Sequence, residues 1–231
     1  MYKFLFLDLD DTILDFRKAE RIALEKTLRG FGIEPTEERC SLYSQINLAY
    51  WKRLERGEIT RAQVLLGRFQ SFFEQVGVCV DSRCAAQCYE ENLSQGHYFL
   101  PGAYEAVVSL SARYQLYLAS NGTARVQSGR IRSSGIAPFF KQIFVSEEIG
   151  ANKPDVLYFS RCFQRISDFE PEKAMIVGDS LTSDIQGGKN AGISTCWVNP
   201  AGVHPKGNVV PDFEITCLGE LENLLESIGD K

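Results

Sequence analysis

Short apolar runs alternate with helical patterns along most of the chain, and this alternation constrains the possible folds more than any other feature. The first run, Phe4 to Leu7, has no sustained polar alternation, which suits a strand buried on both faces. After Pro101-Gly102 such runs recur between helical stretches, and the further strands expected are 116–119, 143–145, 174–177 and 195–198. Strands that alternate with helices form parallel sheets with helices on both faces. The sequence therefore predicts an α/β fold with a Rossmann-like, doubly wound parallel sheet.

The segment from 16 to 92 differs from the rest because its pattern is helical throughout. Its clearest part places apolar residues at the spacings of one helix face, namely Leu65, Phe69, Phe72, Phe73 and Val76. Glycines near positions 30, 57 and 77 predict breaks, so we expect about four helices and no strands. We interpret residues 16–92 as an all-helical insert in a Rossmann-like core formed by residues 1–15 and 93–231.

The charge and hydropathy of the chain exclude several classes of partner. Its 231 residues include 25 Lys and Arg against 30 Asp and Glu, a formal net charge of −5. Binding to a nucleic acid polymer needs a basic surface, so we expect no such partner. No apolar run approaches the roughly 18 residues that span a bilayer, so we expect no membrane partner. The composition leaves the oligomeric state open.

Cysteine and histidine usage bears on location and chemistry. The seven cysteines are scattered without a Cys-x-x-Cys pair, and the N-terminus reaches Asp8 after only a short apolar run. Reduced thiols and the lack of a signal-peptide pattern predict a cytoplasmic protein. Because His97 and His204 are the only histidines, zinc clusters and histidine-based triads are poor candidates for the main chemistry.

Polar residues gather where the predicted strands end. In parallel sheets, ligands bind at the carboxyl ends of the strands, so residues that follow several strands meet at one edge. Here those residues are Asp8, Asp10 and Thr12, then Ser120, Asn121 and Gly122, then Lys153, and finally Asp179, Ser180 and Asp184. The sequence therefore predicts one functional site at this edge of the sheet.

Three carboxylates meet in the predicted site, those of Asp8, Asp10 and Asp179. Like charges at short range raise one another's pKa unless a cation holds them. Hard oxygen ligands with room for water suit Mg²⁺, which binds one or two carboxylates together with substrate phosphate. Asp10 could also protonate a leaving oxygen and later deprotonate an attacking water.

A set of anion-binding groups accompanies the carboxylates. Ser120 and the backbone N–H groups of Asn121 and Gly122 are expected at a helix N-terminus, which is a natural anion site. Lys153 adds a positive charge, and Pro154 suits the first position of a helix, which puts the lysine at a helix start. A cation and anion-binding donors around a carboxylate nucleophile are what phosphoryl transfer to an aspartate needs.

These motifs resemble those of the haloacid dehalogenase-like hydrolases, in their phosphatase branch. The matching positions, in motif order, are Asp8 to Thr12, Ser120, Lys153, and Gly178 to Ser180 with Asp184. The helical insert after the first motif is similar to the small α-helical cap of that family, so the resemblance covers essentially the whole chain.

The resemblance implies a role for each motif residue. Asp8 is implied as the nucleophile and Asp10 as the general acid and base, while Ser120 and Lys153 bind the phosphoryl group. The ligands implied for Mg²⁺ are Asp8, Asp179 and the backbone carbonyl of Asp10, with Asp184 supporting the metal or the lysine. The implied activity is a Mg²⁺-dependent phosphomonoesterase that acts through an aspartyl-phosphate.

The cap is similar to that of the pyrimidine 5'-nucleotidases of this family. The similar stretches are Asn47 to Trp51, Gly57 to Thr60 and Gly67 to Phe69, together with Thr195 to Asn199 after the fourth motif. This resemblance implies hydrolysis of nucleoside monophosphates such as UMP, dUMP and dTMP, a small-molecule partner.

Trp51 and Arg68 are the cap residues expected to contact substrate. Aromatic faces stack on bases, and an arginine can contact phosphate or base. Trp51 fits the apolar core of the cap equally well, and Arg68 fits a solvated helix surface equally well. At the level of sequence both alternatives stay open.

Other activities fit parts of the same pattern. A phosphoglycolate or sugar-phosphate phosphatase, or a phosphomutase, shares the motifs and differs in its cap. A 2-haloacid dehalogenase is disfavoured, since that chemistry needs no acid for an alkoxide leaving group and its enzymes lack an aspartate at the position of Asp10. A phospho-accepting receiver module lacks the long insert, and a ligand-binding member without turnover is expected to have lost a motif residue, whereas none is missing.

Overall fold

The chain forms two compact units in this computed structural model, which describes residues 1–204 and 208–229. The core unit comprises Met1–Phe16 and His97–Lys231, and the helical unit comprises Arg17–Gly96. The second boundary lies four residues beyond the expected 92/93, because the last helix of the helical unit runs to Leu93 and Gly96 approaches Ala19 closely. The predicted core range 93–231 includes residues 205–207 and 230–231, which lie outside the described residues.

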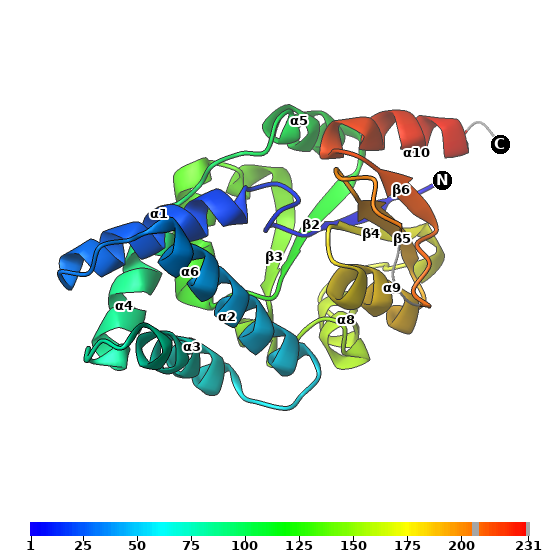
Figure 1. Ribbon diagram of the computed structural model, residues 1–231. Helices are drawn as coiled ribbons and strands as arrows, with labels where there is room; N and C mark the ends of the chain where they lie inside the picture. The colour runs from blue at the N-terminus through cyan, green and yellow to red at the C-terminus, as the bar shows by residue number, and fades with distance from the viewer. Residues whose placement is uncertain (205–207, 230–231) are drawn as a thin grey trace. The chain divides into compact units, whose positions relative to one another are not determined.

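The core unit is built on a six-stranded sheet (Figure 1). Its strands are β1 (Phe4–Leu7), β2 (Gln115–Ser120), β3 (Phe140–Val145), β4 (Ala174–Gly178), β5 (Ser194–Val198) and β6 (Phe213–Ile215). The order across the sheet is β3-β2-β1-β4-β5-β6, and every neighbouring pair is parallel. This arrangement confirms the predicted doubly wound α/β fold. The short strand β6 was not predicted, because three residues are too few to show a pattern.

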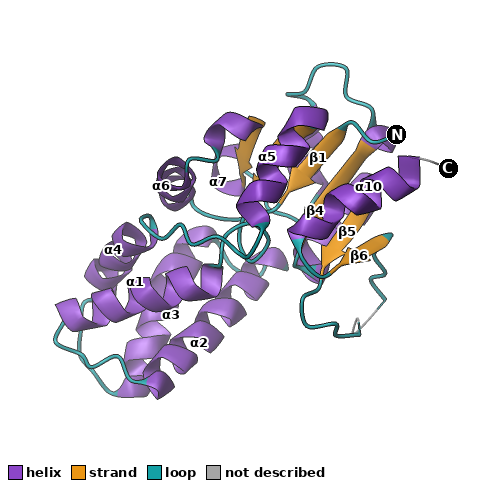
Figure 2. Ribbon diagram, turned by 90° about the horizontal axis from the view of Figure 1, so that it is seen from above, coloured by secondary structure: helices purple, strands orange, loops and turns teal. Residues whose placement is uncertain are grey.

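Apolar clusters lie on both faces of the sheet, as the uninterrupted apolar run of β1 predicts. Leu5 and Leu7 belong to a cluster that includes side chains of α5 (Ala103–Arg113) and α10 (Leu221–Gly229), and Figure 2 shows these two helices over the strands. Phe4 and Phe6 point to the opposite face and pack in a second cluster with α8 (Val156–Phe163). Because successive side chains in a strand alternate in direction, one short run serves both layers.

The remaining described elements of the core unit lie between the strands or after the last one. They are α6 (Ala124–Ser134), the 3₁₀ turn Ala137–Phe139, α7 (Ser146–Ile149), the 3₁₀ turn Pro171–Lys173, a π-type turn Leu181–Ile185, α9 (Gln186–Ala191) and the 3₁₀ turn Leu218–Glu220. The helix expected to open at Pro154 instead begins at Val156, and this part of the prediction is wrong. Asp155 is the N-cap, and its side chain accepts a hydrogen bond from Leu157 N at 2.9 Å, which sets the start of the helix after it.

The helical unit contains four helices, the number that the sequence pattern predicts. They are α1 (Phe16–Gly30), which starts at the unit boundary, α2 (Glu37–Glu55), α3 (Arg61–Val76) and α4 (Ser82–Leu93). Thr60 and Gln63 form a capping box at the start of α3, and Gly77 ends that helix with a φ of 68°. The interior holds a cluster of buried aromatic side chains, those of Tyr43, Phe69, Phe72, Phe73 and Tyr89.

Within the described part of the chain, no helix combines the length and the apolar character needed to cross a bilayer.

Candidate active site

The strand order puts three polar strand ends beside one another. β1 lies between β2 and β4, and the chain runs outward through β2 and β3 before it crosses back to β4. Asp8 directly follows β1, with its backbone N–H donating to the carbonyl of Val177 at 2.9 Å. Ser120 ends β2, and Asp179 directly follows β4. Such a reversal of strand order opens a crevice at the carboxyl ends of the strands, where α/β proteins bind ligands.

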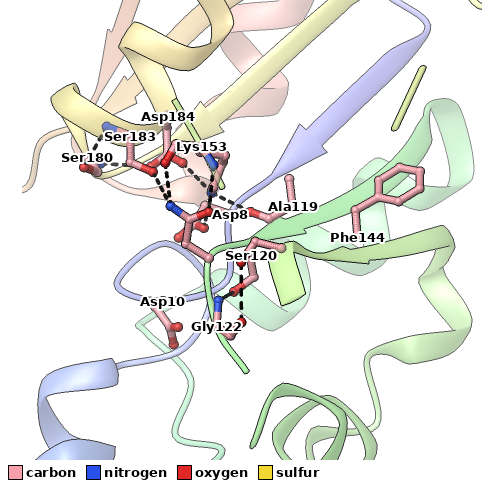
Figure 3. A network of polar contacts seen from close by, with 12 residues as sticks. Asp8, Asp10, Ala119, Ser120, Gly122, Phe144, Lys153, Ser180, Ser183 and Asp184 are labelled. Carbon is pink, nitrogen blue, oxygen red and sulfur yellow. Dashed lines mark hydrogen bonds and ion pairs between the residues drawn. The ribbon is translucent and has the colours of Figure 1, made fainter. Parts of the chain in front are cut away.

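Lys153 lies at the centre of the polar cluster, as Figure 3 shows. Its ammonium group donates to Asp8 Oδ1, to Asp184 Oδ1 and to the backbone carbonyl of Ala119, each at 2.6 Å. An ammonium group has three N–H donors, so these contacts use all of them. Burial lowers the pKa of Lys153, but the charges of Asp184 and Asp8 outweigh burial and leave this pKa above its usual value. The lysine therefore stays charged and offsets part of the negative charge around Asp8.

Three carboxylates face one another beside this lysine. Oxygen atoms of Asp8, Asp179 and Asp184 all lie within 4.8 Å of one another. Burial raises the pKa of Asp8 to about 8, with the charges of Asp184 and Asp10 adding to the effect and Lys153 opposing it. Burial and the charges of Asp184 and Asp8 likewise raise the pKa of Asp179 well above its usual range. More negative charge is gathered here than one lysine neutralises, and the donors are all hard oxygens, so the set fits a divalent cation such as Mg²⁺.

Local backbone geometry brings Asp184 into this cluster. Asp184 lies in the π-type turn after β4, and its Oδ2 accepts a hydrogen bond from Ser180 N at 3.0 Å. The carboxylate passes directly over Gly178, where an added Cβ would lie 2.3 Å from Asp184 Oδ2. Only glycine leaves room for this approach. A second contact supports the backbone of Asp179, because the indole N–H of Trp197 in β5 donates to the carbonyl of Asp179 at 2.8 Å.

The side chain of Asn121 holds the Lys153 segment in place. Its Nδ2 donates to the carbonyl of Lys153 at 2.8 Å and to Ser183 Oγ at 3.3 Å, while its Oδ1 accepts from the backbone N–H of Lys153 at 2.9 Å. The amide is therefore occupied by protein partners. The backbone N–H of Gly122 donates to Ser120 Oγ at 3.3 Å. Phosphate binding by the backbone of Asn121 and Gly122 stays a prediction.

Asp10 lies apart from the carboxylate cluster in Figure 3. Its Oδ1 accepts from the guanidinium group of Arg130, and its Oδ2 accepts from Gln127 Nε2 at 2.7 Å. Gln127 and Arg130 both come from α6 and were not singled out from the sequence. A signal did exist, because they are polar residues three apart in a predicted helix that begins just after Ser120.

The two cap candidates, Trp51 and Arg68, occupy different environments in the helical unit. Trp51 is half-buried, and the guanidinium group of Arg61 lies 5.8 Å from its ring centroid. Arg68 is only 2% exposed, donates to Asn47 Oδ1 at 2.9 Å, and lies 4.9 Å from the ring of Tyr89. The alternative of Arg68 as a solvated surface residue is therefore wrong. A contact of Trp51 or Arg68 with substrate stays a prediction.

The fold and the arrangement of this site define a known class of enzyme. Residues 5–198 match the family of haloacid dehalogenase-like hydrolases, and the chain belongs to this family. The match confirms the family expected from the motifs.

Individual relatives align with nearly the whole chain. It is 40% identical to the pyrimidine 5'-nucleotidase PynA of Streptococcus pneumoniae, with 98% of each chain covered. It is 27% identical to the pyrimidine 5'-nucleotidase YjjG of Escherichia coli, with 97% of this chain and 98% of the relative covered. Among solved structures, that of YfnB from Bacillus subtilis bound to magnesium has a TM-score of 0.92 at 40% identity, covering 97% of this chain and 98% of the other.

Proposed function

We propose that this protein is a Mg²⁺-dependent phosphomonoesterase that hydrolyses pyrimidine nucleoside 5'-monophosphates through an aspartyl-phosphate. The observation that carries the chemistry is the buried carboxylate of Asp8, which lies 2.6 Å from the ammonium group of Lys153 at the edge of an acidic cluster. A carboxylate is a competent nucleophile toward phosphorus when nearby positive charge offsets the charge that develops on the phosphoryl oxygens.

The first step joins Asp8 to phosphorus. One carboxylate oxygen of Asp8 forms the new P–O bond, and the bond to the 5' oxygen of the substrate breaks, leaving its electron pair on that oxygen. Asp10 supplies the proton that neutralises this leaving oxygen. Lys153 offsets negative charge beside Asp8, and the hydroxyl of Ser120 donates to a phosphoryl oxygen.

The second step regenerates Asp8. Asp10, now deprotonated, takes a proton from a water molecule, which attacks the phosphorus of the aspartyl-phosphate. The P–O bond to Asp8 breaks, releasing inorganic phosphate and returning the carboxylate. Asp8, Asp179 and the backbone carbonyl of Asp10, with Asp184 in support, would hold Mg²⁺, which would supply positive charge close to the phosphoryl group.

The substrate class rests on the relatives. Two curated relatives that align with almost all of this chain are named as pyrimidine 5'-nucleotidases, and one of them shares 40% of its residues with this chain. Substrate choice in an enzyme of this kind depends on residues beyond the phosphoryl site, so the proposal for the base is independent of the proposal for the chemistry.

The experiment that tests this proposal is phosphate release from a panel of monoesters in the presence of Mg²⁺. The panel contains UMP, dUMP, dTMP, CMP, AMP, GMP, phosphoglycolate and several sugar phosphates, with Asp8→Asn protein as the blank. We expect the highest kcat/KM for UMP, dUMP or dTMP and no release by the blank. A preference for phosphoglycolate or a sugar phosphate contradicts the substrate class and leaves the chemistry standing, whereas no turnover of any monoester contradicts both.

A further inference from the structure

A buried polar chain on α6 connects two residues that the proposed reaction uses. Gln127 and Arg130 are 1% and 0% exposed. Gln127 Nε2 lies 2.7 Å from Asp10 Oδ2 and 2.8 Å from Ser120 Oγ, and Gln127 Oε1 lies 3.1 Å from a guanidinium nitrogen of Arg130. The same guanidinium group also donates to Asp10. One amide therefore lies between the acid/base residue and the residue expected to bind phosphate.

The chemistry of the partners fixes the direction of this amide. A guanidinium group can only donate hydrogen bonds, so the atom of Gln127 that faces Arg130 must be an acceptor. Gln127 must therefore turn its oxygen to Arg130 and its NH₂ group to Asp10, which is the orientation observed. The NH₂ group has two hydrogens, and Asp10 and Ser120 take one each.

This arrangement determines what the hydroxyl of Ser120 can do. Its oxygen accepts from Gln127 Nε2 at 2.8 Å and from the backbone N–H of Gly122 at 3.3 Å. A hydroxyl oxygen has two acceptor positions, so both are occupied and the O–H proton remains for donation. Among residues 1–204 and 208–229, no protein acceptor takes that proton, and a phosphoryl oxygen is an acceptor that needs such a donor.

The loop before α6 leaves space for the side-chain amide of Gln127. A Cβ added at Gly122 would lie 2.4 Å from both Cγ and Nε2 of Gln127, far inside any normal contact distance. Gln127 can therefore occupy its observed position only because residue 122 is a glycine.

We propose that Gln127, oriented by Arg130, is a positioning residue that fixes Ser120 as a hydrogen-bond donor to the phosphoryl group. This inference rests on the proposed function, since it assigns the phosphoryl group to the site of Ser120. It adds a residue from a helix that carries none of the recognised motifs, and it gives a reason why the Ser120 hydroxyl is available as a donor.

The test is a double-mutant cycle on the affinity for inorganic phosphate, measured by calorimetry with Mg²⁺ present. Gln127→Met removes the amide and keeps the length of the side chain. We expect it to weaken phosphate binding about 10-fold, the value of one oriented hydrogen bond to a charged group. In a Ser120→Ala background the same change should alter the affinity less than about 2-fold, because the hydroxyl that it orients is gone. Gln142→Met, an exposed change on β3, is the matched control and should leave the affinity unaltered.

Two results would overturn the inference, namely equal phosphate affinity of wild type and Gln127→Met, or the same loss in both backgrounds. If Gln127→Met does not fold, as judged by thermal unfolding, Gln127→Glu gives the same test. The new carboxylate would accept the Ser120 proton, so that the hydroxyl could no longer donate it to phosphate. Failure of the proposed function is a separate observation, because it appears as a wild-type protein that binds phosphate but hydrolyses no monoester in the panel.

Discussion

At the scale of single residues, the proposed chemistry depends on a lysine that neutralises a buried aspartate. Lys153 is 1% exposed, and it contacts Asp8 and Asp184 at 2.6 Å. A buried ion pair contributes little net stability compared with an apolar pair, but removal of one partner leaves an uncompensated charge in the interior. Replacement of Lys153 should therefore lower both the activity and the stability of the protein.

Lys153→Met should abolish phosphate release and lower the free energy of unfolding by about 3–5 kcal/mol, the cost of breaking a buried ion pair. Denaturant unfolding of the metal-free protein measures the second quantity. The matched control is Lys189→Met, whose partner Asp212 is about as exposed as the lysine itself, at 39% and 37%. A surface pair of this kind contributes less than about 1 kcal/mol. An equal loss of unfolding free energy in the two variants would show that burial of the Lys153 ion pair does not determine the cost of breaking it.

At the scale of elements, the turn after β4 controls the acidic cluster. The carboxylate of Asp184 crosses over Gly178, and the peptide N–H of Ser180 holds it there. A side chain at position 178 would push Asp184 away from Asp8 and Asp179 without removing any carboxylate.

Gly178→Ala should therefore weaken Mg²⁺ binding about 10- to 100-fold, as expected when a group that orients metal ligands is disturbed. Calorimetric titration with Mg²⁺ measures this affinity, and kcat should fall with it. Gly219→Ala is the control in the same unit, because a Cβ there meets only Cys217 Sγ at 3.7 Å. Unaltered Mg²⁺ affinity in Gly178→Ala would show that the position of Asp184 does not matter for the metal.

Local patterns predicted the elements whose residues signal their own structure. The apolar runs predicted five of the six strands, and the glycine breaks predicted the ends of helices in the helical unit. The motif residues Asp8, Lys153 and Asp184 could be placed together because they follow strands of one sheet. These predictions needed only the residues of each segment and the rule that the carboxyl ends of parallel strands lie at one edge of the sheet.

The rest of the site depends on contacts that no local pattern encodes. Gln127 and Arg130 are polar residues three apart in a predicted helix, but only the packing of α6 beside the loop of Asp10 buries them. Arg68 was missed as an interior residue for the same reason, since Asn47 and Tyr89, its partners, come from two other helices. Burial of a charged side chain becomes predictable only when its partners are known.

At the scale of the whole molecule, the raised pKa values link stability to pH. Asp8 has a pKa of about 8 in the folded protein against 3.8 as the usual value. An acid whose pKa is higher in the folded state favours folding most below the unfolded value, and that contribution is lost as the pH rises through the folded value. The metal-free protein should therefore lose this contribution between pH 3.8 and about 8.

Mg²⁺ should counteract this loss, because it binds the deprotonated carboxylates and stabilises the folded state. The rise in Tm on adding Mg²⁺ should be larger at pH 8 than at pH 5.5, where protons compete for the same oxygens. Thermal unfolding with Mg²⁺ or with EDTA at the two pH values measures the difference. A rise of equal size at both values, or no rise, would contradict the proposed metal site.

The proposed mechanism requires that Asp8 carries the phosphoryl group during turnover. The most direct measurement is acid quenching of the Asp10→Asn variant during turnover of dUMP with Mg²⁺, followed by peptide mapping for a protein-bound phosphoryl group. Loss of a general acid/base should slow turnover about 10²-fold or more and let the intermediate accumulate. We predict the phosphoryl group on the peptide that contains Asp8, and none in a variant that also carries Asp8→Asn. Turnover with no phosphoryl group on the protein, or with the group on another residue, would contradict the proposed role of Asp8.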